Sequence, residues 1–327
     1  MKLKKNIIVV LLLIVIIASI YFVFYFIRSG RNNYSLPKVD PATSFTVIVL
    51  PDTQFYSADH PDIFCKQTQW IVDHKKDLNI VFVSQLGDIV NDGAKRMDEW
   101  ANASKCMGKL DGVVPYSVIP GNHDADISSN KSSGFTAFDS TFPVSRFNAN
   151  SWYGGNYGDN RNNYEIISVD VEHPQKLLFL NLEIEPTDKV LEWADGIVKA
   201  HPDFYTILTT HKYLLAAPGS GREGTVDFSS DGNSGEGIWN KLVKDDCSIS
   251  MVWSGHNHGE NRISSLNSCG KNVNQIVQDY QTLENGGDGW LRIYIFTPTK
   301  HAIEVYTYSP YLDKSNMDLS SRFDLSM

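Results

Sequence analysis

Three stretches of consecutive apolar residues in the first part of the chain alternate with segments of helical spacing. The apolar stretches are residues 45–50, 80–84 and 113–119, and the helical segments are residues 61–76 and 97–110. A strand that is buried on both faces has a near-continuous apolar sequence, whereas a half-exposed strand alternates. Strands that alternate with helices form βαβ units, so the sequence predicts a mainly parallel sheet with helices on its faces.

Polar side chains follow each of these three apolar stretches. Asp52 comes after the first, Asp88 after the second, and Asn122 with His123 after the third. Because the carboxyl ends of parallel strands meet at one edge of a sheet, where ligands bind, we expect these side chains to converge. The alternative is that Asn122 and His123 belong to an ordinary strand-to-loop turn.

Two later apolar stretches end in histidines. Residues 204–210 precede His211, and residues 249–253 precede His256 and His258. One buried histidine is usually structural, but three at strand exits together with two aspartates favour a metal site. Carboxylates and neutral imidazoles suit Zn²⁺, Fe or Mn²⁺ rather than Ca²⁺. The set is large enough for two ions bridged by one carboxylate, an arrangement that clamps an in-line displacement at phosphorus.

The order of these motifs resembles the calcineurin-like metallophosphoesterase family over about residues 45–260. The matching positions are Asp52, Gly87-Asp88, Gly121-Asn122-His123-Asp124, His211 and Gly255-His256-Asn257-His258. The resemblance implies two mixed β-sheets packed as a sandwich and flanked by α-helices. It also implies two divalent metal ions (Mn, Fe or Zn). The residues implied at the first ion are Asp52, Asp88 and His258, and those at the second are Asp88, Asn122, His211 and His256.

Two positions depart from the usual family pattern. Gln54 stands where the first motif normally has a histidine, and an amide is a weaker ligand; we keep Gln54 among the candidate ligands. Asn91 stands where the family often has an aspartate that orients the catalytic histidine. The resemblance implies that His123 is the proton donor to the leaving group or a stabiliser of the transition state, and we name His123 and Asn91 as the catalytic pair. Asn91 can hydrogen-bond His123 but would stabilise its charged form less than a carboxylate does.

The predicted activity is hydrolysis of a phosphoric monoester or diester of unknown class. In this hypothesis a metal-bound hydroxide attacks phosphorus in line, and His123 protonates the departing oxygen. One alternative is a metal-binding extracellular domain with little catalysis, serving adhesion or recognition, which Gln54 and Asn91 favour. Another is a different two-metal hydrolase, such as a peptidase or lactamase, but their histidine motifs are absent. A net charge of −9 argues against a general nucleic-acid surface.

The first thirty residues predict a membrane anchor. Lys2, Lys4 and Lys5 precede an uncharged stretch at residues 7–27, which as a helix would measure roughly 31 Å, enough to cross a bilayer. The basic residues favour a cytoplasmic N-terminus, with the catalytic domain extracytoplasmic and tethered to the membrane. A cleaved signal peptide, and so a secreted protein, is the alternative.

The predicted organisation has four parts. They are the anchor (1–30), a linker (31–44), the phosphoesterase domain (45–312) and a polar, loosely held tail (313–327). Residues 125–162 are too long for a plain connection, so we expect a lid or substrate-facing insertion there. The strands expected after residue 260 alternate as antiparallel strands do. Arg161 and Arg222 are weak candidates for holding phosphate.

An extracytoplasmic location would allow the four cysteines to form disulfides. None lies in a Cys-x-x-Cys pair, so a zinc-finger site is excluded. We expect Cys247 to pair with Cys269, bracing the turn between them, which leaves Cys65 to pair with Cys106. Buried free thiols are the alternative.

Overall fold

The strands of the protein end, as expected, in the polar motifs. A computed structural model describes residues 37–327. The strands are β1 (Phe45–Leu50), β2 (Ile80–Gln85), β3 (Tyr116–Val118), β4 (Tyr153–Asn156), β5 (Asn163–Val169), β6 (Gln175–Leu182), β7 (Tyr205–Thr210), β8 (Ile249–Ser254), β9 (Gly259–Leu266), β10 (Asn272–Asp279), β11 (Leu291–Thr297), β12 (Ala302–Ser309), β13 (Lys314–Asn316) and β14 (Phe323–Ser326).

Helices and shorter helical turns connect these strands. The helices are α2 (Gln54–Asp59), α3 (Pro61–His74), α4 (Met97–Met107), α5 (Thr136–Thr141), α6 (Val144–Phe147), α7 (Asp188–Ala200), α8 (Gly235–Ile238) and α9 (Glu284–Gly287). The turns are η1 (Gly108–Leu110), η2 (Lys131–Ser133), η3 (Trp239–Val243) and η4 (Pro298–Lys300). The region 125–162, predicted as an insertion, therefore holds η2, α5, α6 and β4.

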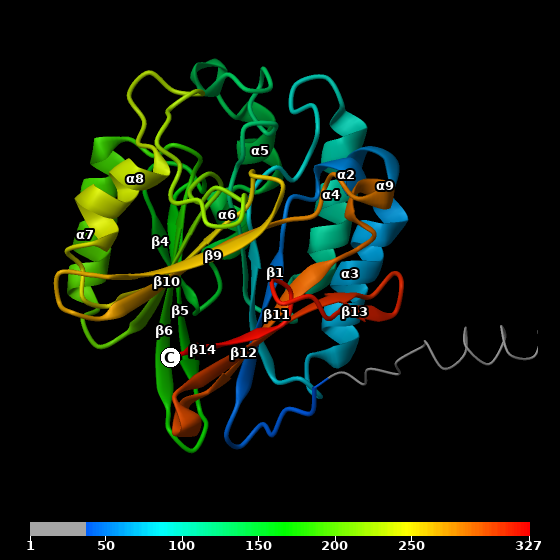
Figure 1. Ribbon diagram of the computed structural model, residues 1–327. Helices are drawn as coiled ribbons and strands as arrows, with labels where there is room; N and C mark the ends of the chain where they lie inside the picture. Colours follow the sequence, from blue (N-terminus) through cyan, green and yellow to red (C-terminus); the bar gives the residue numbers. More distant parts are fainter. Residues whose placement is uncertain (1–36) are drawn as a thin grey trace, which may run out of the picture. The chain divides into compact units, whose positions relative to one another are not determined.

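Two mixed sheets form the domain. One has the order β13-β12-β11-β1-β2-β3, with β14 paired to β12, and the other has the order β4-β5-β6-β7-β8-β10-β9. In the first sheet β1, β2 and β3 are parallel, and in the second β6, β7, β8 and β10 are parallel. Figure 1 shows α3 and α4 outside the first sheet and α7 and α8 outside the second. The predicted sandwich flanked by helices is confirmed.

Apolar side chains from both sheets fill the space between them. Val47 and Val49 of β1 point into this layer, together with Phe82 of β2 and Phe179 of β6. The rings of Phe82 and Phe179 stack with their centroids 3.8 Å apart. Burying such a side chain stabilises the fold by about 1.5–3 kcal/mol. Ile48, between the two valines, is equally buried on the opposite face, which explains why the apolar run of β1 is continuous.

The C-terminal part of the sheets differs from the expectation in two ways. β10 pairs antiparallel with β9 but parallel with β8, so the prediction of only antiparallel strands after residue 260 is wrong. The expected loose tail is also wrong, because β13 and β14 both pair with β12. Phe323 of β14 is buried in the layer between the sheets. Short strands such as β13 and β14 contribute few apolar residues, so their mostly polar sequence did not indicate that they pair with the sheet.

The predicted membrane anchor lies outside the described residues. Residues 37–327 contain no helix with both the length and the apolar character needed to span a bilayer.

Both predicted disulfides are present. Cys65 of α3 is bonded to Cys106 of α4, and Cys247 is bonded to Cys269 in the turn between β9 and β10. These bonds use all four cysteines of the chain, so the alternative of buried free thiols is wrong.

Removal of the Cys65–Cys106 bond is expected to lower the free energy of unfolding by about 3–4 kcal/mol, because the bond closes a loop of 41 residues. The measurement is denaturant unfolding of the Cys247→Ala/Cys269→Ala protein with and without a reductant. In this variant the reductant can open only the remaining bond, and both thiols stay in place. An unchanged free energy of unfolding on reduction would contradict the expectation.

Candidate metal centre

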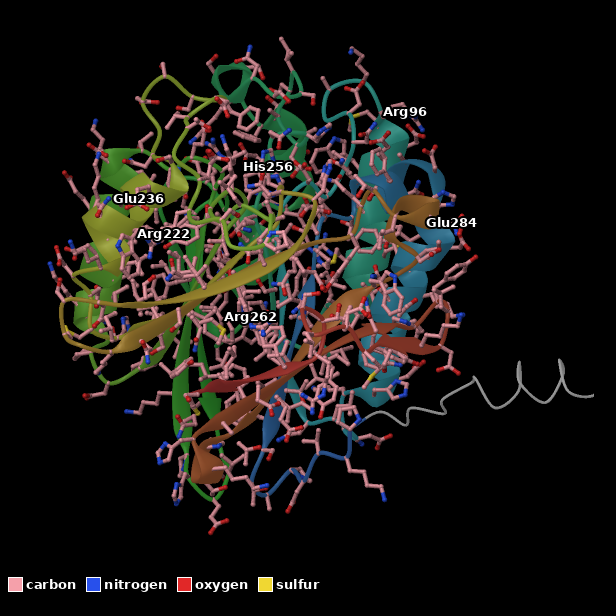
Figure 2. The ribbon with its side chains drawn as sticks, viewed as in Figure 1. Arg96, Arg222, Glu236, His256, Arg262 and Glu284 are labelled. Atoms are coloured by element: carbon pink, nitrogen blue, oxygen red, sulfur yellow. A yellow bond between two sulfur atoms is a disulfide. The ribbon has the colours of Figure 1, made fainter. Side chains whose placement is uncertain are left out.

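Candidate ligands from both sheets meet beyond the carboxyl ends of their strands. Asp88 follows β2 in the first sheet, whereas His211 follows β7 and His256 follows β8 in the second. Each offers one ligand atom, and these atoms all lie within 4.8 Å of one another. Figure 2 shows His256 among the loops beyond the strand ends, in the upper centre of the view. Three of the candidate metal ligands named from the sequence are therefore grouped in space.

Asp88 occupies the middle of this group. Its Oδ2 atom is 3.3 Å from Nε2 of His211, and its Oδ1 atom accepts a 2.8 Å hydrogen bond from the backbone N–H of His123. Burial opposes ionisation of Asp88, but the neighbouring His211 outweighs it and lowers the pKa to about 2. The carboxylate is therefore charged, as a bridging ligand must be.

His211 is fully buried and held by its second ring nitrogen. Nδ1 donates to the backbone carbonyl of Leu86 at 2.8 Å, so Nε2 is directed at Asp88. A metal-binding histidine commonly donates its other N–H to such an acceptor, which fixes the tautomer. Burial alone would lower the pKa of His211, but Asp88 and Asp52 raise it to about 10. Without an ion the imidazole is thus protonated, and a metal ion would displace that proton.

His256 has the opposite protonation state. Burial and the nearby charge of His211 lower its pKa to about 3, so its imidazole is neutral and suited to coordinate a metal. Its backbone has a φ of 65°, in the left-handed region. This conformation lets the backbone N–H of His256 donate to Oδ2 of Asp52 at 2.9 Å.

Two further candidate ligands, Asn122 and His258, differ in burial. Oδ1 of buried Asn122 is 3.2 Å from Nε2 of His211, while its Nδ2 donates to Oγ of Ser129 at 3.2 Å. The amide oxygen of Asn122 thus faces the candidate ligand His211. His258 lies at the open side of the site, with 54% of its side chain exposed and Nε2 3.9 Å from Oδ2 of Asp279.

Two buried oxygens beside this group lack a hydrogen-bond partner within residues 37–327. They are Oδ1 of Asp52, a residue 2% exposed, and Oε1 of Gln54, a residue 3% exposed. A buried polar atom left unsatisfied costs about 1–3 kcal/mol. Burial and the nearby Asp279 raise the pKa of Asp52 well above its usual range. Unpaired oxygens beside carboxylates and imidazoles fit divalent metal ions, so the residues present suit the predicted centre.

Glycines allow the backbone to approach these carboxylates. A Cβ at Gly121 would lie 2.2 Å from Oδ1 of Asp88, and one at Gly255 would lie 2.0 Å from Oδ1 of Asp52. Both distances are far below van der Waals contact, and neither carboxylate can move away without leaving the site.

Gly255→Ala is therefore expected to weaken metal binding and turnover by roughly 10–100-fold, the scale seen when the support of a metal ligand is lost. The measurements are Mn²⁺ titration and turnover of the same preparation. Gly196→Ala in α7 is the control, because a Cβ there meets nothing within 4 Å in the described part of the chain. Equal metal binding by the two variants would show that the close approach of the backbone to Asp52 does not require a glycine at position 255.

His123 is held by the main chain of residue 91. Its Nδ1 is 2.8 Å from the carbonyl oxygen of Asn91 and 3.3 Å from Oγ of Ser128. The predicted contact between Asn91 and His123 is present, but the backbone makes it. This contact therefore does not use the amide side chain of Asn91, and any residue at position 91 could supply the same carbonyl oxygen.

Asp124, the last residue of the Gly121–Asp124 turn, braces two loops. Its carboxylate accepts backbone hydrogen bonds from Ile89 and Val90, at 2.9 Å and 3.0 Å, and from Gly121 at 2.7 Å. Burial and the charge of Asp88 raise its pKa to about 7. Asp124 thus ties the exit of β2 to the exit of β3.

Asp279 and Gln281 border the site but were not predicted. Asp279 is the last residue of β10, and Gln281 lies two residues beyond it. The alternating pattern indicated this strand as antiparallel. The parallel pairing of β10 with β8 puts its carboxyl end at the same edge as the other candidate ligands. Four of the seven residues before Asp279 in β10 are polar, so the sequence lacks the continuous apolar run that marked β1.

The two arginines considered for phosphate are occupied elsewhere. Arg161 forms ion pairs with three carboxylates, those of Asp139, Asp159 and Glu183. Arg222 lies over the ring of Trp239, 3.7 Å from its centroid, and pairs with Glu236 at 3.3 Å. Figure 2 shows Arg222 and Glu236 together, away from His256.

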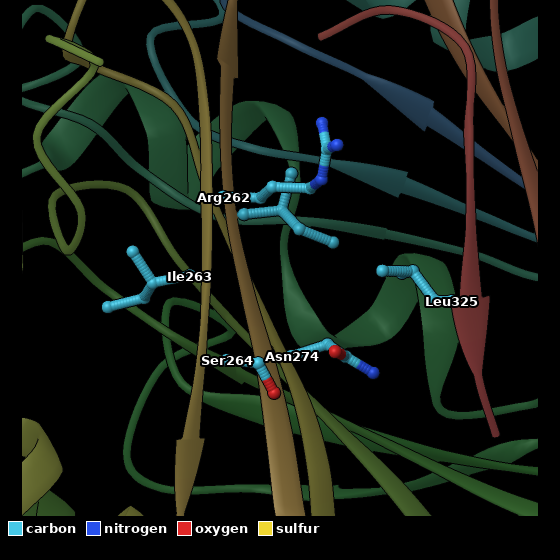
Figure 3. Close-up of a pocket in the computed structure, with 6 residues that line it drawn as sticks. Arg262, Ile263, Ser264, Asn274 and Leu325 are labelled. Carbon is cyan, nitrogen blue, oxygen red and sulfur yellow. The ribbon is translucent and has the colours of Figure 1, made fainter. Parts of the chain in front are cut away.

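A separate cavity of about 170 Å³ lies between β9, β10 and β14. Its lining, drawn in Figure 3, consists of Arg262, Ile263, Ser264, Asn274, Ile276 and Leu325. This lining has no carboxylate or imidazole, so it offers no candidate for metal chemistry.

Two solved structures share the fold. A dimetal phosphatase from Danio rerio superposes with a TM-score of 0.56 at 12% identity, covering 88% of this chain and 99% of that one. GAP50, the anchor in the inner membrane complex of Plasmodium, superposes with a TM-score of 0.51 at 12% identity, covering 87% of this chain and 89% of that one. At this identity the likeness concerns the fold alone.

Sequence comparison identifies the family. The uncharacterised protein YvnB of Bacillus subtilis is 36% identical over 300 residues, an alignment that covers 89% of this chain. The chain spans only 22% of the length of that relative. The family model described as calcineurin-like phosphoesterase matches residues 45–260, the region that holds all the candidate ligands named from the sequence. The chain belongs to the calcineurin-like phosphoesterase family.

Proposed function

We propose that the chain is a phosphoester hydrolase that works with two divalent metal ions. The observation that carries the proposal is the grouping of Asp88, His211 and His256 within 4.8 Å at the ends of three strands. Membership of the phosphoesterase family supports the same reaction class. The most direct test is metal analysis of the protein, combined with a panel of phosphoric monoesters and diesters.

The residues that would hold the ions divide into two sets that share Asp88. The first set is Asp52, Gln54, Asp88 and His258, and the second is Asp88, Asn122, His211 and His256. Two divalent ions at such a centre lower the pKa of water and offset the charge on the phosphoryl oxygens. The metals we propose are Mn, Fe or Zn, since the donors are carboxylates, amides and imidazoles.

His123 is positioned to move a proton. Because the carbonyl of Asn91 can only accept, Nδ1 of His123 carries a hydrogen. Nε2 is then the nitrogen that can deliver a proton to the departing oxygen of the substrate. The backbone N–H of His123 meanwhile donates to Asp88, so the same residue orients a candidate ligand.

Direct attack by water predicts inversion at phosphorus, because the proposal includes no covalent enzyme intermediate. Hydrolysis of a chiral phosphate ester with isotopically labelled oxygens measures the outcome. Retention would instead require two displacements, and so a nucleophilic side chain that the proposal does not contain.

We also propose that a helix formed by residues 7–27 anchors the protein to a membrane, with the catalytic domain extracytoplasmic. The two disulfides support an oxidising compartment. Membrane fractionation, followed by protease treatment of intact and of lysed cells, tests this location. A catalytic domain that resists protease until lysis would contradict it, and a domain released into the medium would indicate signal cleavage.

The alternative is an adhesion or recognition domain with little catalysis. Gln54, where the family usually has a histidine, favours it because a weakly held ion would limit turnover. The shared fold does not decide between the two, since the solved relatives include both a phosphatase and an anchor. Hydrolysis of an aryl phosphate with added Mn²⁺, lost in Asp88→Asn, would exclude this alternative.

A further inference from the structure

Gln54 belongs to a row of three buried side chains that begins at Asp279. Oδ1 of Asp279 accepts the backbone N–H of Gln281 at 2.9 Å, and Oδ2 accepts Nε2 of Gln281 at 2.9 Å. Nε2 of Gln54 in turn donates to Oε1 of Gln281. Asp279, Gln281 and Gln54 are at most 4% exposed, so water does not compete for these bonds.

The hydrogen bonds give this row a direction. Both carboxyl oxygens of Asp279 accept hydrogen bonds from Gln281, one from its backbone N–H and one from Nε2, so the amide of Gln281 turns its NH₂ group toward Asp279. Its carbonyl oxygen must then face Gln54 and accept from it. Gln54 consequently directs its NH₂ group at Gln281 and leaves Oε1 without a partner within residues 37–327.

This arrangement prepares the first metal site for a cation. Oε1 of Gln54 and Oδ1 of Asp52 are both buried and unsatisfied, which is costly unless a positive charge meets them. Nε2 of Gln281 also approaches Oδ2 of Asp52, at 3.5 Å, so one amide contacts both residues that supply these oxygens. In the described part of the chain, the ion-pair partner of Asp279 is His258, at 3.9 Å.

We propose that Asp279 and Gln281 are positioning residues of the first metal site, fixing the carbonyl oxygen of Gln54, and the ring of His258, toward the ion. The inference rests on the proposed two-metal centre and deepens it. A neutral amide is a weaker ligand than imidazole, and an amide free to rotate presents oxygen only part of the time. Locking its orientation before binding removes that loss, as partners of metal ligands commonly do.

The test is Mn²⁺ titration of the full chain carrying Gln281→Met, a substitution of similar size that cannot hydrogen-bond to Gln54. We expect one of the two Mn²⁺ affinities to fall by roughly 10–100-fold and the other, assigned to Asn122, His211 and His256, to stay unchanged. Equal weakening of both sites, or of neither, would overturn the inference.

Gln278→Met is the matched control. Gln278 is also fully buried on β10, but its Oε1 accepts the hydroxyl of Tyr294 at 2.8 Å in the layer between the sheets. The same chemical change there should lower thermal stability while both Mn²⁺ affinities remain. Loss of metal by this control as well would mean that general destabilisation causes the effect of Gln281→Met.

A double-mutant cycle separates positioning from simple packing. In a Gln54→Ala protein, the oxygen that Gln281 is proposed to orient is already gone, so adding Gln281→Met should weaken the first site little further. Fully additive effects of the two substitutions would overturn the role of Gln281. Asp279→Asn is expected to weaken the same site in both backgrounds, because it also removes the partner of His258.

The Mn²⁺ affinities are measured independently of turnover, so failure of the inference and failure of the proposed function can be distinguished. A wild-type protein that binds two Mn²⁺ ions but hydrolyses no phosphoester would overturn the proposed function and leave the positioning role measurable. A wild-type protein that binds one ion, unaffected by Gln54→Ala, would overturn the positioning role while hydrolysis with one metal could still be assayed.

Discussion

Asp88→Asn is expected to reduce turnover by roughly 10³-fold, the upper range for removing one preorganised electrostatic group from an active site. Asp88 is the residue that both proposed ions share, and its carboxylate lies 3.3 Å from His211. An asparagine of equal size can still accept the backbone N–H of His123 through its oxygen, so the loops should keep their positions. The loss should therefore appear in metal content and turnover, and not in the fold, as measured by metal analysis, circular dichroism and kinetics.

The same change at an exposed carboxylate supplies the control. Asp98 in α4 has 61% of its side chain exposed and pairs with Arg96 on the surface. Asp98→Asn should leave metal content and turnover as in the wild-type protein. Turnover retained by Asp88→Asn at a wild-type level would be incompatible with a bridging role for this carboxylate.

His123→Ala is expected to lower kcat by about 10²–10⁴-fold, the usual contribution of a positioned general acid. Metal content should stay near the wild-type value, because alanine keeps the backbone N–H that donates to Asp88. The deficit should shrink for aryl esters whose leaving groups depart without a proton. Parallel metal analysis and kinetics with good and poor leaving groups measure both effects.

Two results would contradict this role for His123. A fall in metal content in proportion to activity would make it a ligand or a structural residue. An equal loss of activity for good and poor leaving groups would exclude proton donation, although His123 could then still stabilise charge at phosphorus.

The elements with the most buried residues could be predicted from the sequence alone. β1 and β2 are continuous apolar runs because both of their faces are covered, and a short run rich in β-branched residues is typical of such a strand. Since these strands are parallel, the residues directly after them had to share one edge of the sheet. This argument covers Asp52 and Asp88 of the first sheet, whereas the meeting of Asp88 with His211 and His256 depends on how the two sheets pack.

Features that depend on contacts between distant segments could not be predicted in this way. The six-residue helix α2 has too few turns for a periodic pattern, so the helix that begins at Gln54 could not be predicted. Asp279 was missed because β10 has one antiparallel and one parallel neighbour, and alternation indicates only the first. That a backbone carbonyl holds His123 is likewise invisible in a sequence, since every residue has one.

The candidate ligands come from loops of both sheets, so metal binding would also affect the stability of the folded protein. An ion bound by Asp88 of one sheet and by His211 of the other would link the two sheets. A ligand that binds only the folded state stabilises it, by about 2.7 kcal/mol at a hundred times its dissociation constant. Metal scarcity would thus reduce the lifetime of the folded chain as well as its activity, leaving it more exposed to proteases.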